Sequence, residues 1–260
     1  MIELRRRPGA PPLRIAHRGA PFVAPENTLR SLRAAVGLGV DAVEFDVLRL
    51  DDDTLVLAHS DDLLDITHGA VAGRAHRMTL AELHEIAPEL PTLDDALTLF
   101  RDEAPDVGVH IDLKRVGYEA RVVDCLRRHG MLARSIVSSP FAPSVIALAR
   151  ADPTLQRGFS YPVDRYGVSS RRVLAPLVPV GAAALRGMLP RRIARLLRAA
   201  GASFASLYFG VISRQTIARC HAAGAAVVAW TVDDPRVARR LVSAGVDGIV
   251  TNDPQMFGLL

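Results

Sequence analysis

Charged side chains alternate with apolar ones in two short segments of the sequence. In the first, Glu44 and Asp46 are separated by Phe45 and flanked by Val43 and Val47. Side chains two residues apart in a strand point to the same face, so these carboxylates would project together. Two neighbouring carboxylates repel each other unless they share a proton or a cation. A hard divalent ion that prefers oxygen ligands, Mg²⁺ or Ca²⁺, would satisfy this pair.

The second segment repeats the pattern with a carboxylate and an amine. Asp112 and Lys114 alternate with Ile111 and Leu113, so they would share a face and Asp112 could supply a third metal oxygen. Lys114 is the single lysine among 32 basic residues. Its compact charge can balance the acidic cluster and hold a substrate oxyanion. His110 has the same parity, so it would either lie behind Asp112 or be a buried histidine with its hydrogen bonds satisfied elsewhere.

Two histidines follow apolar runs and are candidates for proton transfer. His17 ends one run and is followed by Arg18 and Gly19, and His59 follows another. An imidazole can act as an acid or a base near neutral pH, and a guanidinium can bind phosphate or carboxylate in a two-point fashion. Trp230, at the end of a later apolar run, would be either a pocket wall or a core residue.

Short β-branched segments alternate with helical patterns along the whole chain. This alternation predicts an α/β protein, a (β/α)₈ TIM barrel formed by residues 1–260 as one domain, in which the carboxyl ends of the strands carry the site. The expected strands are Leu13–His17, Ala42–Val47, Val109–Leu113, Ser135–Ser138, Leu155–Phe159, Phe204–Leu207, Ala226–Thr231 and Gly248–Thr251. The expected helices are Thr28–Leu38, Leu93–Phe100, Glu119–His129, Pro143–Ala151, Arg191–Ala200, Ser213–Ala223 and Pro235–Ala244.

Two stretches exceed a minimal barrel. Residues from about 60 to 91 are polar and follow a strand-like run at Thr54–Ala58, which predicts a small insertion after the second strand. The stretch Arg171–Arg198 is apolar, has arginine at both ends and contains three prolines, so we expect it to be too interrupted for one helix. As a basic amphipathic segment it could rest on an anionic membrane surface; the alternative is a lid or a packing helix pair.

Composition excludes several classes of protein. Hydrophobic residues make up 49% and charged residues 23%, which is typical of a globular chain. The net charge of +4 and the 5% of aromatic residues do not suggest nucleic-acid binding. Cys125 and Cys220 have no zinc-ligand spacing. The sequence has no secretory signal and no apolar stretch long enough to span a membrane, so we expect a cytoplasmic protein.

Taken together, these segments resemble the glycerophosphodiester phosphodiesterase family. The resemblance covers about Leu13 to Pro254, and its specificity comes from the order of the motifs. The matching segments are Ile15–Gly19, Pro25–Thr28, Val43–Val47, His59, His110–Lys114, Ala229–Val232 and Gly245–Pro254.

The resemblance implies a barrel enzyme of lipid and glycerol metabolism. It would use one divalent cation and two histidines to cleave a small glycerol-linked phosphodiester, releasing an alcohol and glycerol 3-phosphate. The implied roles are metal binding by Glu44, Asp46 and Asp112; acid and base catalysis by His17 and His59; phosphate binding by Arg18 and Lys114; orientation by Glu26; and a glycerol-side wall from Trp230.

The chain departs from the family pattern at two places. The family often has Glu where Asp112 stands, and the shorter side chain moves the carboxylate by about one bond. After its second histidine the family usually has an Asp and then an Arg-Thr pair, whereas this chain has the run 60–67, Ser-Asp-Asp-Leu-Leu-Asp-Ile-Thr. This difference concerns the support of His59 and the choice of substrate.

Two other functions are compatible with the same residues. One is a lysophospholipase D-like enzyme that acts on lysolipids at a membrane surface and makes peripheral contact through residues 171–198. The other is a catalytically inactive barrel that serves as a binding module. A suitable charged residue at every site position favours an enzyme over the inactive barrel.

Overall fold

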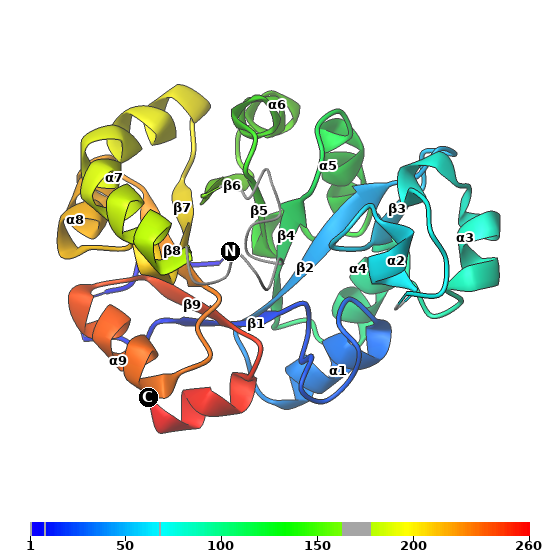
Figure 1. The fold of residues 1–260 in the computed structure, drawn as a ribbon, viewed down its shortest axis with the longest axis horizontal. Coiled ribbons are helices and arrows are strands. Elements are labelled where there is room, and N and C mark those ends of the chain that lie inside the picture. The colour runs from blue at the N-terminus through cyan, green and yellow to red at the C-terminus, as the bar shows by residue number, and fades with distance from the viewer. Residues whose placement is uncertain (1, 8, 68, 163–177) are drawn as a thin grey trace.

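The computed structural model describes residues 2–7, 9–67, 69–162 and 178–260, and its centre is a closed parallel barrel (Figure 1). The barrel strands pair in the order β1-β2-β4-β5-β6-β7-β8-β9, and β9 pairs with β1. They are β1 (Leu13–His17), β2 (Ala42–Arg49), β4 (Gly108–Leu113), β5 (Ser135–Ser139), β6 (Gln156–Tyr161), β7 (Phe204–Tyr208), β8 (Ala226–Trp230) and β9 (Gly248–Thr251). The predicted TIM barrel is therefore confirmed.

Helices between the strands form the outer layer (Figure 1). They are α1 (Leu29–Gly37), α4 (Leu93–Asp102), α5 (Glu119–Arg128), α6 (Ala142–Ala151), α7 (Val178–Ala200), α8 (Arg214–Ala222) and α9 (Pro235–Ala244). Side-chain caps fix several of their starts, as when Thr28 accepts from the Ser31 N–H at α1. Short 3₁₀ segments are η2 (Leu132–Arg134), η4 (Phe209–Val211) and η5 (Pro254–Leu259).

The insertion after the second strand begins as a hairpin. Strand β3 (Leu55–Leu57) pairs antiparallel with β2, with Val47 opposite Leu57. The chain then forms α2 (Leu63–Ile66), η1 (Ala75–Arg77) and α3 (Leu80–Ile86) before α4. A separate apolar cluster that includes Leu48, Val56 and Leu83 holds these elements against the outer part of β2. The insertion thus has its own small core at one side of the barrel mouth.

Alternation along the strands separates two environments. Outward residues such as Phe45 are fully buried under the helices, where Phe45 stacks on Phe100 at 6.1 Å between ring centroids. Inward residues fill the barrel with a smaller cluster that includes Ile15 and Phe204. Gly158 leaves room for Phe204, because a Cβ there would lie 2.3 Å from that ring. Apolar packing closes the lower barrel, so polar side chains can gather only at the upper ends of the strands.

The expectation for residues 171–198 is wrong in its described part. Instead of a broken segment, α7 runs over 23 residues with Pro190 inside it. A proline in a helix removes one hydrogen bond and crowds the preceding turn, but the apolar stripe of α7 buries enough surface to keep it helical. The buried residues of this stripe are Ala182, Leu189, Ile193, Leu197 and Ala200.

Burial of this stripe also bears on the membrane hypothesis. The apolar face of α7 packs on the barrel and α8, so this face is not free to contact lipid. Residues 171–177, which belong to the same hypothesis, lie outside the described part of the chain. Among the helices described, none combines the length and the apolar character needed to cross a bilayer.

Replacing Ile193 by Ala should lower the free energy of unfolding by about 2–5 kcal/mol, because the side chain is fully buried. Arg195→Ala on the exposed side of α7 is the matched control and should change it by less than about 0.5 kcal/mol. Urea unfolding of the two variants measures both values. Equal effects would contradict the packing of α7 on the barrel.

Candidate active site

A buried carboxylate, Asp46, is the centre of the polar mouth. Its side chain is 1% exposed and lies beside two cations and one amide donor. Lys114 Nζ lies 2.7 Å from Oδ1, Arg18 Nε lies 3.0 Å from Oδ2, and Asn27 Nδ2 donates to Oδ2 at 3.1 Å. These positive and hydrogen-bonding groups hold the pKa of Asp46 below its usual range despite burial, with Lys114 the largest stabilising charge and Arg18 the next.

Lys114 joins the two strands that the alternating pattern singled out. Asp46 and Asp112 are paired neighbours in the register of β2 and β4, and Lys114 Nζ also lies 2.6 Å from Asp112 Oδ2. Burial alone would lower the pKa of this amine, but Asp112 and Asp46 raise it above its usual value. Lys114 is therefore charged, and its charge is already shared between two carboxylates.

A chain of hydrogen bonds supports Asp112 from inside the barrel. Its Oδ1 accepts from Ser138 Oγ at 2.6 Å and from Ser160 Oγ at 3.1 Å. Because the Ser138 hydroxyl donates to Asp112, it accepts from His110 Nε2, which lies 2.9 Å away. His110 therefore stands behind Asp112 as its parity predicts, and burial lowers its pKa to about 4, which keeps it neutral.

Glu44 is a second buried carboxylate on β2, two residues before Asp46 and on the same face of the strand. It is 4% exposed, and its Oε2 accepts the backbone N–H of Arg18 at 3.0 Å. Burial raises the pKa of Glu44 well above its usual value, and the negative charges of Asp46 and Asp112 add to this shift. The mouth therefore contains more negative charge than Lys114 and Arg18 neutralise.

A left-handed turn after β1 brings Arg18 into the mouth. Arg18 has a φ of 53° and Asn27 a φ of 57°, and the two residues close the loop through the Asn27 N–H to the Arg18 carbonyl at 3.0 Å. The guanidinium then reaches both Asp46 and Glu26, whose Oε1 accepts from Nη1 at 2.8 Å. Glu26 thus orients Arg18, as the implied role suggests, although it is itself exposed.

His17 is held in one orientation by residues at the end of β9. Asn252 Nδ2 donates to Asp233 Oδ2 at 2.8 Å, which leaves Asn252 Oδ1 to accept from His17 Nδ1 at 2.7 Å. The proton of the neutral ring is therefore on Nδ1. His17 Nε2 is then free to accept a proton and lies 3.8 Å from Glu44 Oε2.

His59 follows β3, which pairs with β2, and stands at the start of the insertion. The pKa of His59 and that of His17 are each lowered to about 4, in both cases mainly because protein replaces water around the ring. Lys114 and Arg18 add to this effect at His59. Both imidazoles are therefore neutral at pH 7 before any anionic ligand binds.

The carboxylates have the chemistry of a cation site. Hard oxygen donors on two neighbouring strands and the raised pKa of Glu44 fit a divalent cation, because such an ion would offset the surplus negative charge. In the described residues, however, Glu44, Asp46 and Asp112 do not each place an oxygen within 4.8 Å of the other two. Lys114 lies between Asp46 and Asp112, so an ion on these oxygens would compete with the lysine.

Aromatic rings line the mouth on the side of β7 and β8. Trp230 ends β8 and is half-buried, and its ring centroid lies 5.8 Å from that of Tyr208 at the end of β7. Trp230 therefore lies at the carboxyl end of its strand, where its ring contacts Tyr208 and also packs against the inner apolar cluster of the barrel. This position suits contact with an apolar part of a ligand.

Three residues that support the site have no assigned role in the sequence pattern. Ser138 contacts Asp112, Asn27 contacts Asp46, and Asn252 contacts His17. Their positions at the carboxyl ends of strands or in the first loop were the available signals.

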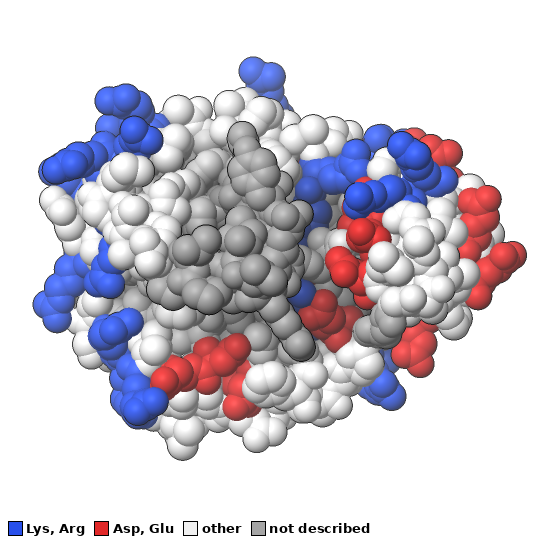
Figure 2. Space-filling view, viewed as in Figure 1, with Lys and Arg blue, Asp and Glu red and all other residues white. Residues whose placement is uncertain are grey.

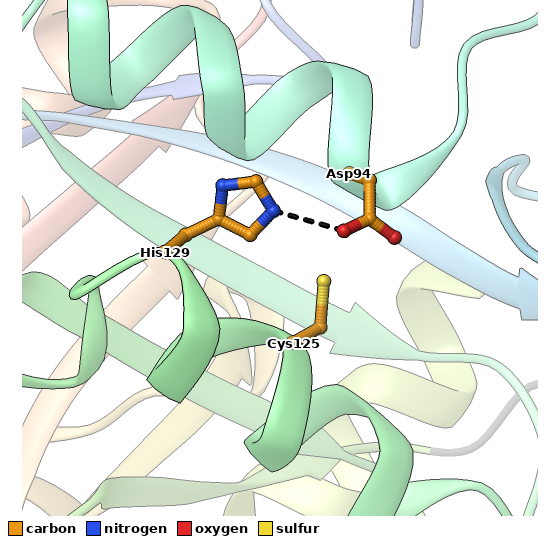
Figure 3. Close-up of side chains that lie close together, drawn as sticks. All are labelled: Asp94, Cys125 and His129. Carbon is orange, nitrogen blue, oxygen red and sulfur yellow. Dashed lines mark hydrogen bonds and ion pairs between the residues drawn. The ribbon is translucent and has the colours of Figure 1, made fainter.

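Another group of possible metal ligands lies on α4 and α5, outside the mouth (Figure 3). Cys125 and His129 are one helical turn apart, and His129 Nε2 lies 2.9 Å from Asp94 Oδ1. Arg128 also donates to Asp94 at 3.1 Å, and Arg101 Nη1 lies 3.4 Å from His129 Nδ1. One guanidinium contacts Asp94 and another contacts His129, and their positive charges oppose the binding of a cation here. Burial also raises the pKa of the Cys125 thiol to about 12, which disfavours the thiolate that a metal would need.

A closed parallel barrel with acids, bases and cations at the carboxyl ends of its strands is the architecture of barrel enzymes. The family model of the glycerophosphoryl diester phosphodiesterase family matches residues 17–256. The chain therefore belongs to this family, which is a family of hydrolases, and enzymes of the family generally depend on a divalent cation.

Relatives with known names match nearly the whole chain. A glycerophosphodiester phosphodiesterase of Caldanaerobacter subterraneus subsp. tengcongensis is 27% identical over 93% of this chain and 94% of its own length. A probable glycerophosphodiester phosphodiesterase 1 of Mycobacterium tuberculosis is 30% identical over 94% and 90%.

Solved structures agree with this match. A phosphodiesterase of Oleispira antarctica in complex with the product sn-glycerol-3-phosphate has a TM-score of 0.72 and 25% identity, over 94% of each chain. A putative glycerophosphoryl diester phosphodiesterase of Silicibacter pomeroyi has a TM-score of 0.76 and 25% identity, over 97% of this chain and 93% of that one.

Stability should fall as the pH decreases from about 6.5 to 4, in part because of His110. The pKa of His110 is about 4 in the fold and about 6.5 in the unfolded chain, so the unfolded chain binds more protons in this window. The contribution of His110 to the free energy of unfolding is therefore complete above pH 6.5, and about 3 kcal/mol of it is lost by pH 4.

Urea unfolding at several pH values tests this dependence. The raised pKa of Glu44 contributes with the opposite sign, so the measurement is a difference between wild type and His110→Gln, in which the carboxylates are common to both. We expect a shallower loss of stability on acidification in the variant. The same slope in both proteins would contradict the neutral state of His110.

Proposed function

We propose that the chain hydrolyses a glycerophosphodiester to glycerol 3-phosphate and an alcohol with a divalent cation and two histidines. The observation that carries the proposal is that two neutral imidazoles, His17 and His59, lie within electrostatic reach of the same Asp46–Lys114 ion pair at the carboxyl ends of the strands. Family membership and the glycerol 3-phosphate bound to the Oleispira antarctica enzyme support the substrate class.

The cations of the mouth are suited to the phosphoryl group. Arg18 and Lys114 both face the centre, and each is tied to carboxylates that keep it charged and in place. Positive groups that are already positioned stabilise charge on phosphoryl oxygens in the transition state without reorganising, which is usually the largest part of catalysis. We assign phosphate binding to these two residues.

The hydrogen bonds around His17 make it the base. With its proton on Nδ1 and held by Asn252, its Nε2 can take a proton from the nucleophile, which is a water or a hydroxyl of the substrate glycerol. His59 then gives a proton to the oxygen of the leaving alcohol. An anionic phosphodiester beside His59 raises the pKa of its imidazole and favours the protonated form that this role needs.

Glu44, Asp46 and Asp112 would hold the cation, Mg²⁺ or Ca²⁺. The ion supplies Lewis-acid stabilisation of phosphoryl oxygens when it is bound. Lys114 already contacts Asp46 and Asp112, so an ion on these oxygens would share them with the ammonium.

His17→Ala and His59→Ala should each lower kcat by about 10²–10⁴-fold, because each removes one proton-transfer group. Release of glycerol 3-phosphate from glycerophosphocholine measures the rate, and circular dichroism checks the fold. His129→Ala, on α5 outside the mouth, is the matched control and should keep the wild-type rate. A folded His17 or His59 variant with the wild-type rate would disprove its role.

EDTA should abolish activity, and Mg²⁺ or Ca²⁺ should restore it. Glu44→Gln should weaken cation binding, measured by calorimetry, by about tenfold or more, because a carboxylate oxygen with surplus charge is replaced by a neutral amide. Full activity in EDTA, or unchanged cation affinity in the Glu44 variant, would argue against this cation site. Lysophosphatidylcholine in the same assay tests the lysolipid alternative.

A further inference from the structure

A cavity of about 640 Å³ extends from the mouth toward the insertion. Its lining comes from the loop before α1, the end of β3 with the residues that follow it, and two parts of the insertion. His59 and Glu26 belong to this lining, so the cavity is continuous with the candidate active site. The lining residues are Pro25–Thr28, Leu57–Ser60, Asp65–Thr67 and Ile86–Leu90.

The charge of this cavity is opposite to that of the whole chain. Glu26, Asp65 and Glu89 are exposed carboxylates of its lining, while none of its described lining residues is a lysine or arginine. Glu26 is paired with Arg18, but Asp65 and Glu89 have no ion-pair partner among the described residues. Figure 2 shows acidic side chains beside the mouth where Figure 1 places α2. The chain as a whole carries +4.

Apolar side chains lie between the carboxylates. Ile66 of α2 and Ile86 of α3 are partly buried and face the same cavity, together with Leu90. An ammonium that carries methyl groups is a weakly hydrated cation with an apolar surface, so it gains from both kinds of neighbour. A neutral polyol would lose hydration at the isoleucines and gain no charge interaction.

We propose that this cavity binds the leaving alcohol of the substrate and selects a cationic amino alcohol, with a quaternary ammonium such as choline as the best fit. The inference rests on the proposed function and adds the identity of the head group. His59 lines the cavity and can protonate the alcohol oxygen as its bond to phosphorus breaks, while the phosphoryl group stays with glycerol. Asp65 and Glu89 would attract the ammonium at the far end.

The position of the other groups agrees with this direction of binding. Arg18 and Lys114 lie at the centre for the phosphoryl group, and Trp230 lies on the opposite side, toward β7 and β8, for the glycerol part. A substrate laid across the mouth in this order places its alcohol oxygen near His59. The leaving alcohol then enters the cavity that the insertion lines.

The experiment isolates the charge of the head group. It compares kcat/KM for two glycerophosphodiesters, glycerophosphocholine and glycerophospho-3,3-dimethylbutanol. In the second compound a carbon atom replaces the quaternary nitrogen, so the shape is kept and the charge is removed. Phosphorus NMR follows release of glycerol 3-phosphate from both. We expect a ratio of about fivefold in favour of choline at low salt, falling toward one at high salt, because exposed charges interact weakly and are screened.

Variants of the cavity test which residues set the ratio. Asp65→Asn with Glu89→Gln should bring the ratio close to one. Glu85→Gln is the matched control, since Glu85 is an exposed residue of α3 in the same insertion that does not line the cavity, and it should keep the wild-type ratio. An equal fall in the control would assign the effect to the overall charge of the insertion and would overturn the site.

The proposed hydrolysis and the cationic head-group site are disproved by different outcomes. If neither ester is hydrolysed by the wild-type protein, the proposed function is wrong. If both are hydrolysed with equal kcat/KM, or if the ratio is unchanged in the double variant, the function stands and the cationic head-group site is wrong.

Discussion

The active-site mouth depends on one buried carboxylate. Asp46 of β2 is 1% exposed and would be costly to bury alone, yet it is met by Lys114 just after β4 and by Arg18 and Asn27 of the loop that joins β1 to α1. These contacts join three separate parts of the chain at one point. The same contacts align the groups that would bind phosphate, so stability and function share one network. Its geometry is fixed because each partner is itself held by a further hydrogen bond or ion pair.

The closure of the barrel brings both histidines to this network. His17 ends β1, lies beside Glu44 of β2 and is tied through Asn252 to the end of β9, whereas His59 follows β3, which also pairs with β2. The local pattern predicts both histidines at strand ends, but only the pairing of β1 with β9 brings Asn252 to His17. The insertion then adds a wall that a minimal barrel does not have. Its charge differs from that of the central cations, which gives the mouth distinct ends.

The carboxylates of the mouth outnumber its cations. Glu44 has a raised pKa because it is buried, and the charges of Asp46 and Asp112 raise it further while Lys114 and Arg18 oppose the shift only in part. A proton on Glu44 satisfies the balance in the isolated chain, and a divalent ion would satisfy it in the working enzyme. Asp112 accepts hydrogen bonds from Ser138 and Ser160, which fix the position of its carboxylate beside Lys114.

The amino-acid sequence by itself determined the barrel, the strand ends and the charged candidates, because alternation of side chains is local and survives without knowledge of the partner strands. It also located Glu44, Asp46, Asp112 and Lys114 on shared faces. Only the tertiary structure decided that Lys114 lies between Asp46 and Asp112, that Ser138 and Asn252 orient the site, and that α7 continues through Pro190. These features depend on packing and on contacts between residues far apart in the chain, for which local periodicity carries no signal.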